Sequence, residues 1–100
     1  EYEVERQRNA AQFYHSPYDL VTVRGELKLT NFKDEAITVE ISKTVSGEVI
    51  DAEGEPEITK LAEGLRSVNA KSKILWKKEV KPGQDNAVNL EYQYQVYVRN

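Results

Sequence analysis

Apolar and polar side chains alternate most regularly in the last stretch of the chain. From position 88 to 99 the even positions are apolar or aromatic and the odd ones nearly all polar: Val88, Leu90, Tyr92, Tyr94, Val96 and Val98 against Asn89, Glu91, Gln93, Gln95, Tyr97 and Arg99. A period of two places one set on a buried face and the other on water, which a helix cannot do. The pattern predicts a long final β-strand. Because so long a strand exceeds the usual length, we also predict a bend or bulge within it.

A second alternating strand is expected just before it, from Lys73 to Val80. Its inward side carries Ile74, Trp76 and Val80, and Lys78 interrupts that row. Between the two strands, Pro82-Gly83 has the residue order of a tight turn.

Earlier in the chain the same alternation predicts two more strands. Val21, Val23, Gly25, Leu27 and Leu29 share one parity, and so do Ile37, Val39 and Ile41. The polar segment between them, residues 31–35, favours a hairpin that joins the two strands. A glycine on the inward side of a strand, here Gly25, indicates a bulge or the close approach of another segment.

The remaining segments are shorter or less regular. Residues 1–8 alternate like a first, charged edge strand, and Pro17 marks a connection or an irregular edge. A short strand is expected near residues 48–50, before an acidic loop at 51–56. Residues 58–68 fit a strand or loop better than a short helix, although their apolar spacing leaves the helix open.

Together these segments predict an all-β protein, an antiparallel immunoglobulin-like β-sandwich of about seven strands, with a small barrel as the alternative. The 100 residues are enough for a single domain, 1–100. The chain starts at Glu1 and contains no methionine, so we expect it to be a piece of a larger protein.

Charge and composition narrow the classes of partner. The net charge of -3 comes from mixed signs and leaves no basic stripe, so we expect no nucleic-acid partner. No run approaches the roughly 20 apolar residues of a membrane span, so we expect no membrane insertion. The absence of cysteine excludes a disulfide framework and a thiolate nucleophile.

No group of residues in the sequence suggests catalysis or a cofactor. His15 is the only histidine, and it could form a triad only with Ser16 and Asp19. Adjacent residues on an extended chain point to opposite sides, so they cannot meet as nucleophile and base. The acidic loop lacks the ordered ligands of a calcium site, and a zinc site needs more nitrogen or sulfur ligands. We therefore predict no catalytic residue, no metal and no cofactor.

Aromatic residues offer a weak candidate binding surface. Trp76 could stack on a sugar with Tyr92 and Tyr94, but its inward parity favours a place in the core. Tyr97 lies on the polar parity of the last strand. The predicted binding surface is therefore Tyr97, Gln93, Gln95, Tyr14 and Tyr18.

Four segments resemble a known family: residues 31–39, 69–76 (ending at Trp76), 80–83 and 92–97. Over Val21 to Arg99 the chain is similar to the C-terminal β-sandwich domain of unknown function found in mucoidy-inhibitor-like bacterial proteins. The resemblance implies a domain appended to a larger bacterial protein outside the cytoplasm, in the cell envelope or secreted. It implies no catalytic residues.

Two functions follow as hypotheses. The first is a non-catalytic structural or protein-interaction module, not an enzyme, that uses a sheet edge or a loop end and binds the rest of its parent chain or another protein. The second is a carbohydrate-binding module, which requires two or more of Trp76, Tyr14, Tyr18 and Tyr97 to face solvent on one surface.

Overall fold

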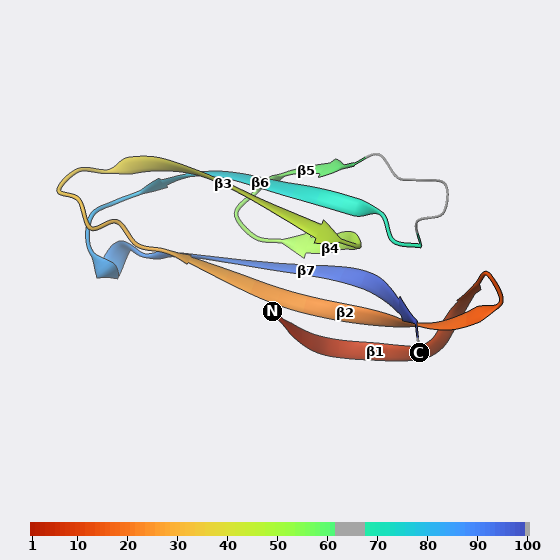
Figure 1. The fold of residues 1–100 in the computed structure, drawn as a ribbon. Coiled ribbons are helices and arrows are strands. Elements are labelled where there is room, and N and C mark those ends of the chain that lie inside the picture. The colour runs from red at the N-terminus through yellow and green to blue at the C-terminus, as the bar shows by residue number, and fades with distance from the viewer. Residues whose placement is uncertain (62–67, 100) are drawn as a thin grey trace.

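A computed structural model describes residues 1–61 and 68–99 and shows an all-β protein (Figure 1). These residues form seven strands and one short 3-10 helix at Gln84–Asn86: β1 (Tyr2–Phe13), β2 (Ser16–Leu29), β3 (Ile37–Ser46), β4 (Glu48–Ala52), β5 (Glu57–Lys60), β6 (Lys71–Val80) and β7 (Val88–Arg99). They form a four-stranded sheet in the order β1-β2-β7-β4 and a three-stranded sheet in the order β3-β6-β5. All pairings within these sheets are antiparallel. The predicted all-β class, with two antiparallel sheets and seven strands, is confirmed.

The long pair β2 and β7 forms the centre of the four-stranded sheet. Its register runs unbroken for twelve pairs, from Tyr18 opposite Arg99 to Leu29 opposite Val88. Of the predicted bend or bulge within the last strand, this pairing therefore shows no bulge. The register shifts lie instead in the two outer strands, β1 and β4, where a bulge distorts only one neighbour. The molecule is elongated, with extents of 57 × 26 × 17 Å.

The predicted hairpin between residues 20–30 and 37–42 is also wrong. Both strands form, but β2 belongs to the four-stranded sheet and β3 to the three-stranded one, so the chain crosses between layers at residues 30–36 (Figure 1). Asn31 holds this crossing: it is 1% exposed, and its side-chain amide donates to the carbonyl oxygens of Glu35 at 2.8 Å and Val80 at 2.9 Å. The connection at Pro82-Gly83 likewise joins different sheets, since β6 and β7 do not pair.

The core lies between the two sheets, as the alternation predicts. It contains Val45, Ile74, Trp76, Leu90 and Tyr92, and Trp76 has no exposed surface. The indole N–H of Trp76 donates to the Glu53 carbonyl oxygen at 2.8 Å, which satisfies its one polar atom. Burying aromatic residues of this size stabilises a small sandwich strongly.

Gly25 lies on the inner side of β2, where the ring of Tyr92 packs directly over it. The two residues are opposite each other in the register, and a Cβ on Gly25 would lie 2.2 Å from the Tyr92 Cζ atom. Of the two alternatives for an inward glycine, the structure shows close approach and no bulge in this pair.

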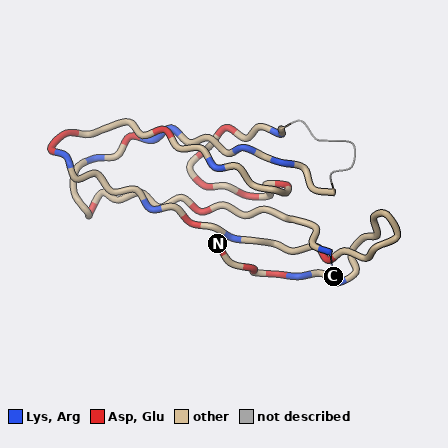
Figure 2. The backbone as a smooth tube through the Cα atoms, viewed as in Figure 1, with Lys and Arg blue, Asp and Glu red and all other residues tan. Residues whose placement is uncertain are grey.

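The shorter segments agree with the predicted edge strand and short strand, but the predicted acidic loop at 51–56 begins only at Glu53, because Asp51 and Ala52 pair with β7 as part of β4. β1 is an edge strand, β4 covers the expected short strand, and residues 53–56 form the acidic connection to β5. Figure 2 shows acidic residues along this connection and lysines along β6. The strand prediction holds for β5, while most of the contested segment 58–68 lies outside the described residues.

Candidate interaction surfaces

The predicted binding residues lie mainly on the outer face of the four-stranded sheet. Gln93, Gln95 and Tyr97 of β7 share this face with Tyr18 of β2, because the register aligns Leu20 with Tyr97 and Thr22 with Gln95. All four are half-buried, whereas Tyr14, at the tip of the β1–β2 hairpin, is 66% exposed. The structure thus brings four of the five together and leaves Tyr14 apart at the tip.

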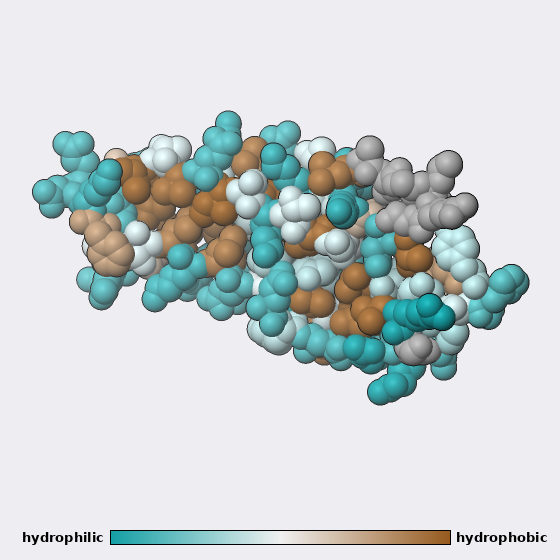
Figure 3. Space-filling view, in the orientation of Figure 1, coloured by the Kyte–Doolittle hydropathy of each residue, from teal (hydrophilic) through white to brown (hydrophobic). Residues whose placement is uncertain are grey.

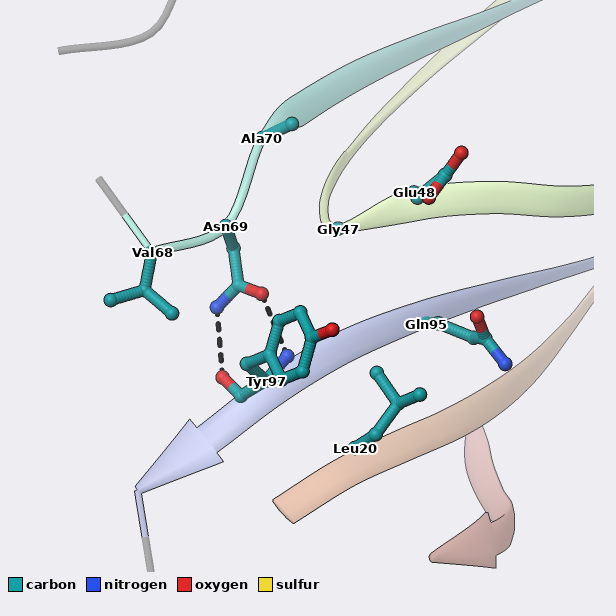
Figure 4. Close-up of a pocket in the computed structure, with 8 residues that line it drawn as sticks. All are labelled: Leu20, Gly47, Glu48, Val68, Asn69, Ala70, Gln95 and Tyr97. Carbon is teal, nitrogen blue, oxygen red and sulfur yellow. Dashed lines mark hydrogen bonds between the residues drawn. The ribbon is translucent and has the colours of Figure 1, made fainter. Parts of the chain in front are cut away.

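A shallow pocket of about 230 Å³ opens beside Tyr97 (Figure 4). Asn69 forms one wall by pairing with the backbone of Tyr97: its amide donates to the Tyr97 carbonyl at 2.8 Å, and its oxygen accepts from the Tyr97 N–H at 2.7 Å. Because β4 pairs with β7 only as far as Gln95, this side chain takes the place of a neighbouring strand. The other lining residues are Leu20, Gly47, Glu48, Val68, Ala70 and Gln95.

The aromatic rings near the pocket pack against one another. Phe13 lies edge-on to Tyr18, with ring centroids 5.3 Å apart, and edge-on to Tyr97 at 5.1 Å. A sugar-stacking platform needs an open ring face, and this mutual edge-to-face packing consumes ring surface. Phe13 is the member of this cluster that the sequence prediction missed.

Polar side chains on the same face also satisfy one another. Arg24 forms an ion pair with Glu91, and Gln95 lies 3.5 Å from the Thr22 hydroxyl. Thr22 is only 6% exposed although it is on the outer face. The surface therefore presents few polar groups that still need a ligand.

Trp76 and its tyrosine neighbours are not a surface platform. Trp76 is fully buried, and Tyr92 is 2% exposed with its hydroxyl donating to a Glu1 carboxylate oxygen at 2.7 Å. Burial, and then the Glu1 carboxylate, raise the pKa of both Tyr92 and Tyr94. These rings belong to the core and its border, so Trp76 is excluded from the carbohydrate hypothesis.

A buried carboxylate in the β1–β2 hairpin was not expected from the sequence. Asp19 has no exposed surface and accepts hydrogen bonds from the Arg6 guanidinium at 2.8 Å and from the Asn9 backbone N–H at 3.1 Å. Asn9 has a positive φ of 52° and lies where the β1–β2 register shifts between Gln7 and Ala11. Asp19 therefore holds a β-bulge in place, and only the bulged backbone makes its burial possible.

The three residues considered for a triad do not come together in the structure. Asp19 is bound to Arg6 and Asn9, while His15 is exposed at the hairpin turn, so the imagined triad with Ser16 does not assemble. Within residues 1–61 and 68–99, no three histidine, cysteine or acidic side chains gather as metal ligands.

The four edge strands differ in how they are protected against pairing with another chain. β1 carries two register shifts and the charges of Glu3, Glu5, Arg6 and Arg8. β4 has five residues and one register shift, and β5 has four residues. Bulges, charges and short length are the usual devices that block an exposed edge.

β3 lacks these devices along most of its length. It pairs with β6 through ten consecutive residues without a register shift, and its other side has no partner strand among the described residues. It contains no proline, and Glu40 and Lys43 are its only charges. We call the unpaired backbone side of Ile37–Ser46 the open edge.

The inner side of the open edge is apolar and incompletely covered. Ile37, Val39 and Ile41 are half-buried, whereas Val45 is 4% exposed. Figure 3 shows hydrophobic side chains visible between the two layers, in the part of the molecule where β3 and β2 lie. An added strand would cover this apolar surface.

No protein-family model, no curated protein and no solved structure matches the chain. Among the described residues, no helix is long and apolar enough to cross a bilayer.

Proposed function

We propose that this chain is a non-catalytic protein-interaction module whose working surface is the open edge of β3. The observation that carries the proposal is the ten-residue edge strand without bulge or proline, beside an incompletely covered apolar inner side. An extended segment that adds to such an edge gains main-chain hydrogen bonds, and alternate side chains give specificity. The pocket beside Tyr97 supports the proposal less, because its side chains already bind one another.

The proposal extends to architecture and context. The two facing sheets support an immunoglobulin-like sandwich in general form. The strand order differs from the immunoglobulin constant type, because the fifth and seventh strands exchange sheets. The resemblance over Val21 to Arg99 supports a place in a larger bacterial protein that acts outside the cytoplasm.

Site-specific photo-crosslinking in the native cells tests the working surface. A benzophenone amino acid is placed at Ser42, exposed on β3, or at Lys73, exposed on the central strand β6. Both positions are on the outer face of the same sheet, so Lys73 controls for simple exposure. We expect a discrete protein adduct from Ser42 and none from Lys73.

The captured protein is then purified and its affinity measured against proline variants at Glu40 and Ile41. The backbone N–H groups of neighbouring residues on a strand point to opposite sides. A proline at one of the two positions therefore removes a hydrogen bond to β6, and a proline at the other removes an N–H donor from the open edge. We expect the edge-facing proline to keep the fold, judged by circular dichroism, and to weaken binding at least about 10-fold. Equal adducts from both positions, or unchanged affinity with the edge-facing proline, would rule out the open edge as the binding surface.

A further inference from the structure

We propose that the strand added to β3 comes from a different protein and carries a carboxylate opposite Lys43, with apolar residues at its other inward positions. This inference rests on the proposed function and names the chemistry of the partner. Its basis is the position and the unmet charge of one lysine.

Lys43 is the only charged side chain on the inner side of β3. It lies opposite Ile74 in the register, between Ile41 and Val45 on the same face, and is half-buried. No carboxylate within the described part of the chain forms an ion pair with it. A lysine ammonium gains from an opposite charge nearby, and directly opposed residues of paired strands have Cβ atoms only about 5 Å apart.

A second copy of this chain cannot supply that charge through β3. Antiparallel pairing of two β3 strands keeps both inner faces on the same side, so Lys43 could meet only Ile37, Val39, Ile41, Lys43 or Val45 of the other copy. None of these is acidic. In the register centred on Lys43, the two copies of Lys43 would face each other. In the register centred on Glu40, the two copies of Glu40 would face each other. Parallel pairing would turn the apolar side of one copy outward.

The other positions of β3 define the rest of the partner. Apolar residues suit the positions opposite Ile37, Val39, Ile41 and Val45, since those side chains are apolar and form the inner face. The outer face has Thr38, Ser42 and Thr44 around a single acid, Glu40, and all four are exposed. A partner with threonine-like residues there and a cation opposite Glu40 complements the strand on both faces.

A synthetic peptide tests this chemistry directly. The probe is a blocked, fluorescently labelled nine-residue peptide, Val-Thr-Glu-Thr-Val-Lys-Val-Thr-Val. When it pairs antiparallel with residues 37–45, its glutamate is opposite Lys43 and its lysine opposite Glu40. The control peptide exchanges the glutamate and the lysine. Binding is followed by fluorescence polarisation, and the binding surface by amide shifts in NMR spectra.

We expect the glutamate-first peptide to bind at least about 10-fold more tightly than the exchanged peptide, with shifts confined to β3 and its neighbours. Lys43→Glu should abolish the preference, because each peptide then has one like-charged and one oppositely charged pair with positions 40 and 43. The matched control Lys73→Glu should leave it unchanged, because Lys73 is on the outer face of the central strand.

Three results would overturn the inference. If both peptides bind at β3 with equal affinity, strand addition stands and the carboxylate preference fails. If neither binds, and sedimentation shows a dimer that the edge-facing proline separates, the occupant is a second copy. If Lys43→Val makes a monomer self-associate without changing the ratio of peptide affinities, Lys43 is a barrier to pairing. Loss of the proposed function itself would show differently, as no edge-specific adduct from Ser42 and no peptide binding.

Discussion

The two long edge strands, β1 and β3, are held in the fold by different forces. β3 pairs with β6 directly over the core, where its own Val45 packs with Ile74 and Trp76. β1 pairs only with β2, is mostly exposed, and is held by the buried Asp19 and its bulge. An edge supported by a core can stay regular, whereas an edge supported by local polar contacts is bulged and closed to partners. The difference predicts which mutations unfold the whole domain and which loosen one hairpin.

The largest loss of stability is expected from a mutation in the core that supports β3. Trp76→Ala should lower the free energy of unfolding by about 4 kcal/mol, because it empties a large buried site and leaves the Glu53 carbonyl without its donor. Denaturant unfolding followed by circular dichroism measures the loss. Trp76→Phe should cost clearly less, since most of the ring volume remains.

The same residue offers a test without mutation. Because Trp76 is the only tryptophan and is fully buried, its fluorescence should be blue-shifted and resist acrylamide. It should not respond to soluble polysaccharides. A quenchable emission that one sugar shifts would revive the carbohydrate hypothesis against the interaction module.

The second largest loss of stability is expected at Gly25, which lies in β2 opposite Tyr92 of β7. Gly25→Ala should cost about 3 kcal/mol, because the new methyl group collides with the ring of Tyr92. Tyr92→Leu removes the collision, so the alanine should cost much less in that background. A double-mutant cycle measures the coupling, and purely additive losses would contradict the ring contact.

The third loss of stability should be confined to β1 and its pairing with β2. Asp19→Asn should lower stability by about 2 kcal/mol, less than for a fully buried pair because Arg6 is about one third exposed. Hydrogen exchange should show lost protection in β1 and little change in β3 and β6. The control is Glu3, the exposed partner of Arg6: Glu3→Gln should leave the stability nearly unchanged, because water screens an exposed ion pair. Equal losses of protection in β1 and β6 would remove the distinction between the two edges.

The smallest expected effect is a gain in stability at the tip of the β1–β2 hairpin. Tyr14 and His15 both have positive φ, 51° and 65°, as a two-residue type I′ turn requires. Replacing them with Asn-Gly should raise stability by about 1 kcal/mol, because these residues adopt that conformation with less strain. The melting temperature reports the gain, and Tyr14→Val should lower it, since a β-branched residue is poorer still.

The strands and their buried faces were predictable because alternation depends only on local sequence. Leu90, Tyr92 and Trp76 are buried as their parity predicts. The choice of partner was not predictable, since an alternating strand pairs equally well in either sheet; the predicted β2–β3 hairpin failed for that reason. The connection is long enough to cross between layers, and Asn31 holds it there.

The candidate surfaces show the same limit. The shared face of Gln93, Gln95 and Tyr97 follows from parity, but the occupation of that face by Phe13 and Asn69 depends on segments far apart in the chain. Asp19 could not be identified as buried, because a bulge is a property of the paired backbone. The inward parity of Lys43 is visible in the sequence, yet its meaning depends on knowing that β3 is an edge.

The pairing of β2 with β7 also governs how this chain can fold. β7, one of the two central strands of the larger sheet, follows the other six described strands along the chain, so this sheet cannot close until β7 is available. Before then the β1–β2 hairpin and the three-stranded sheet can form, but β2 offers an unpaired side. Folding dominated by such distant pairings typically takes milliseconds to seconds. A nascent chain of this protein therefore has its longest exposed edge in the moments before β7 arrives, when premature association is most damaging.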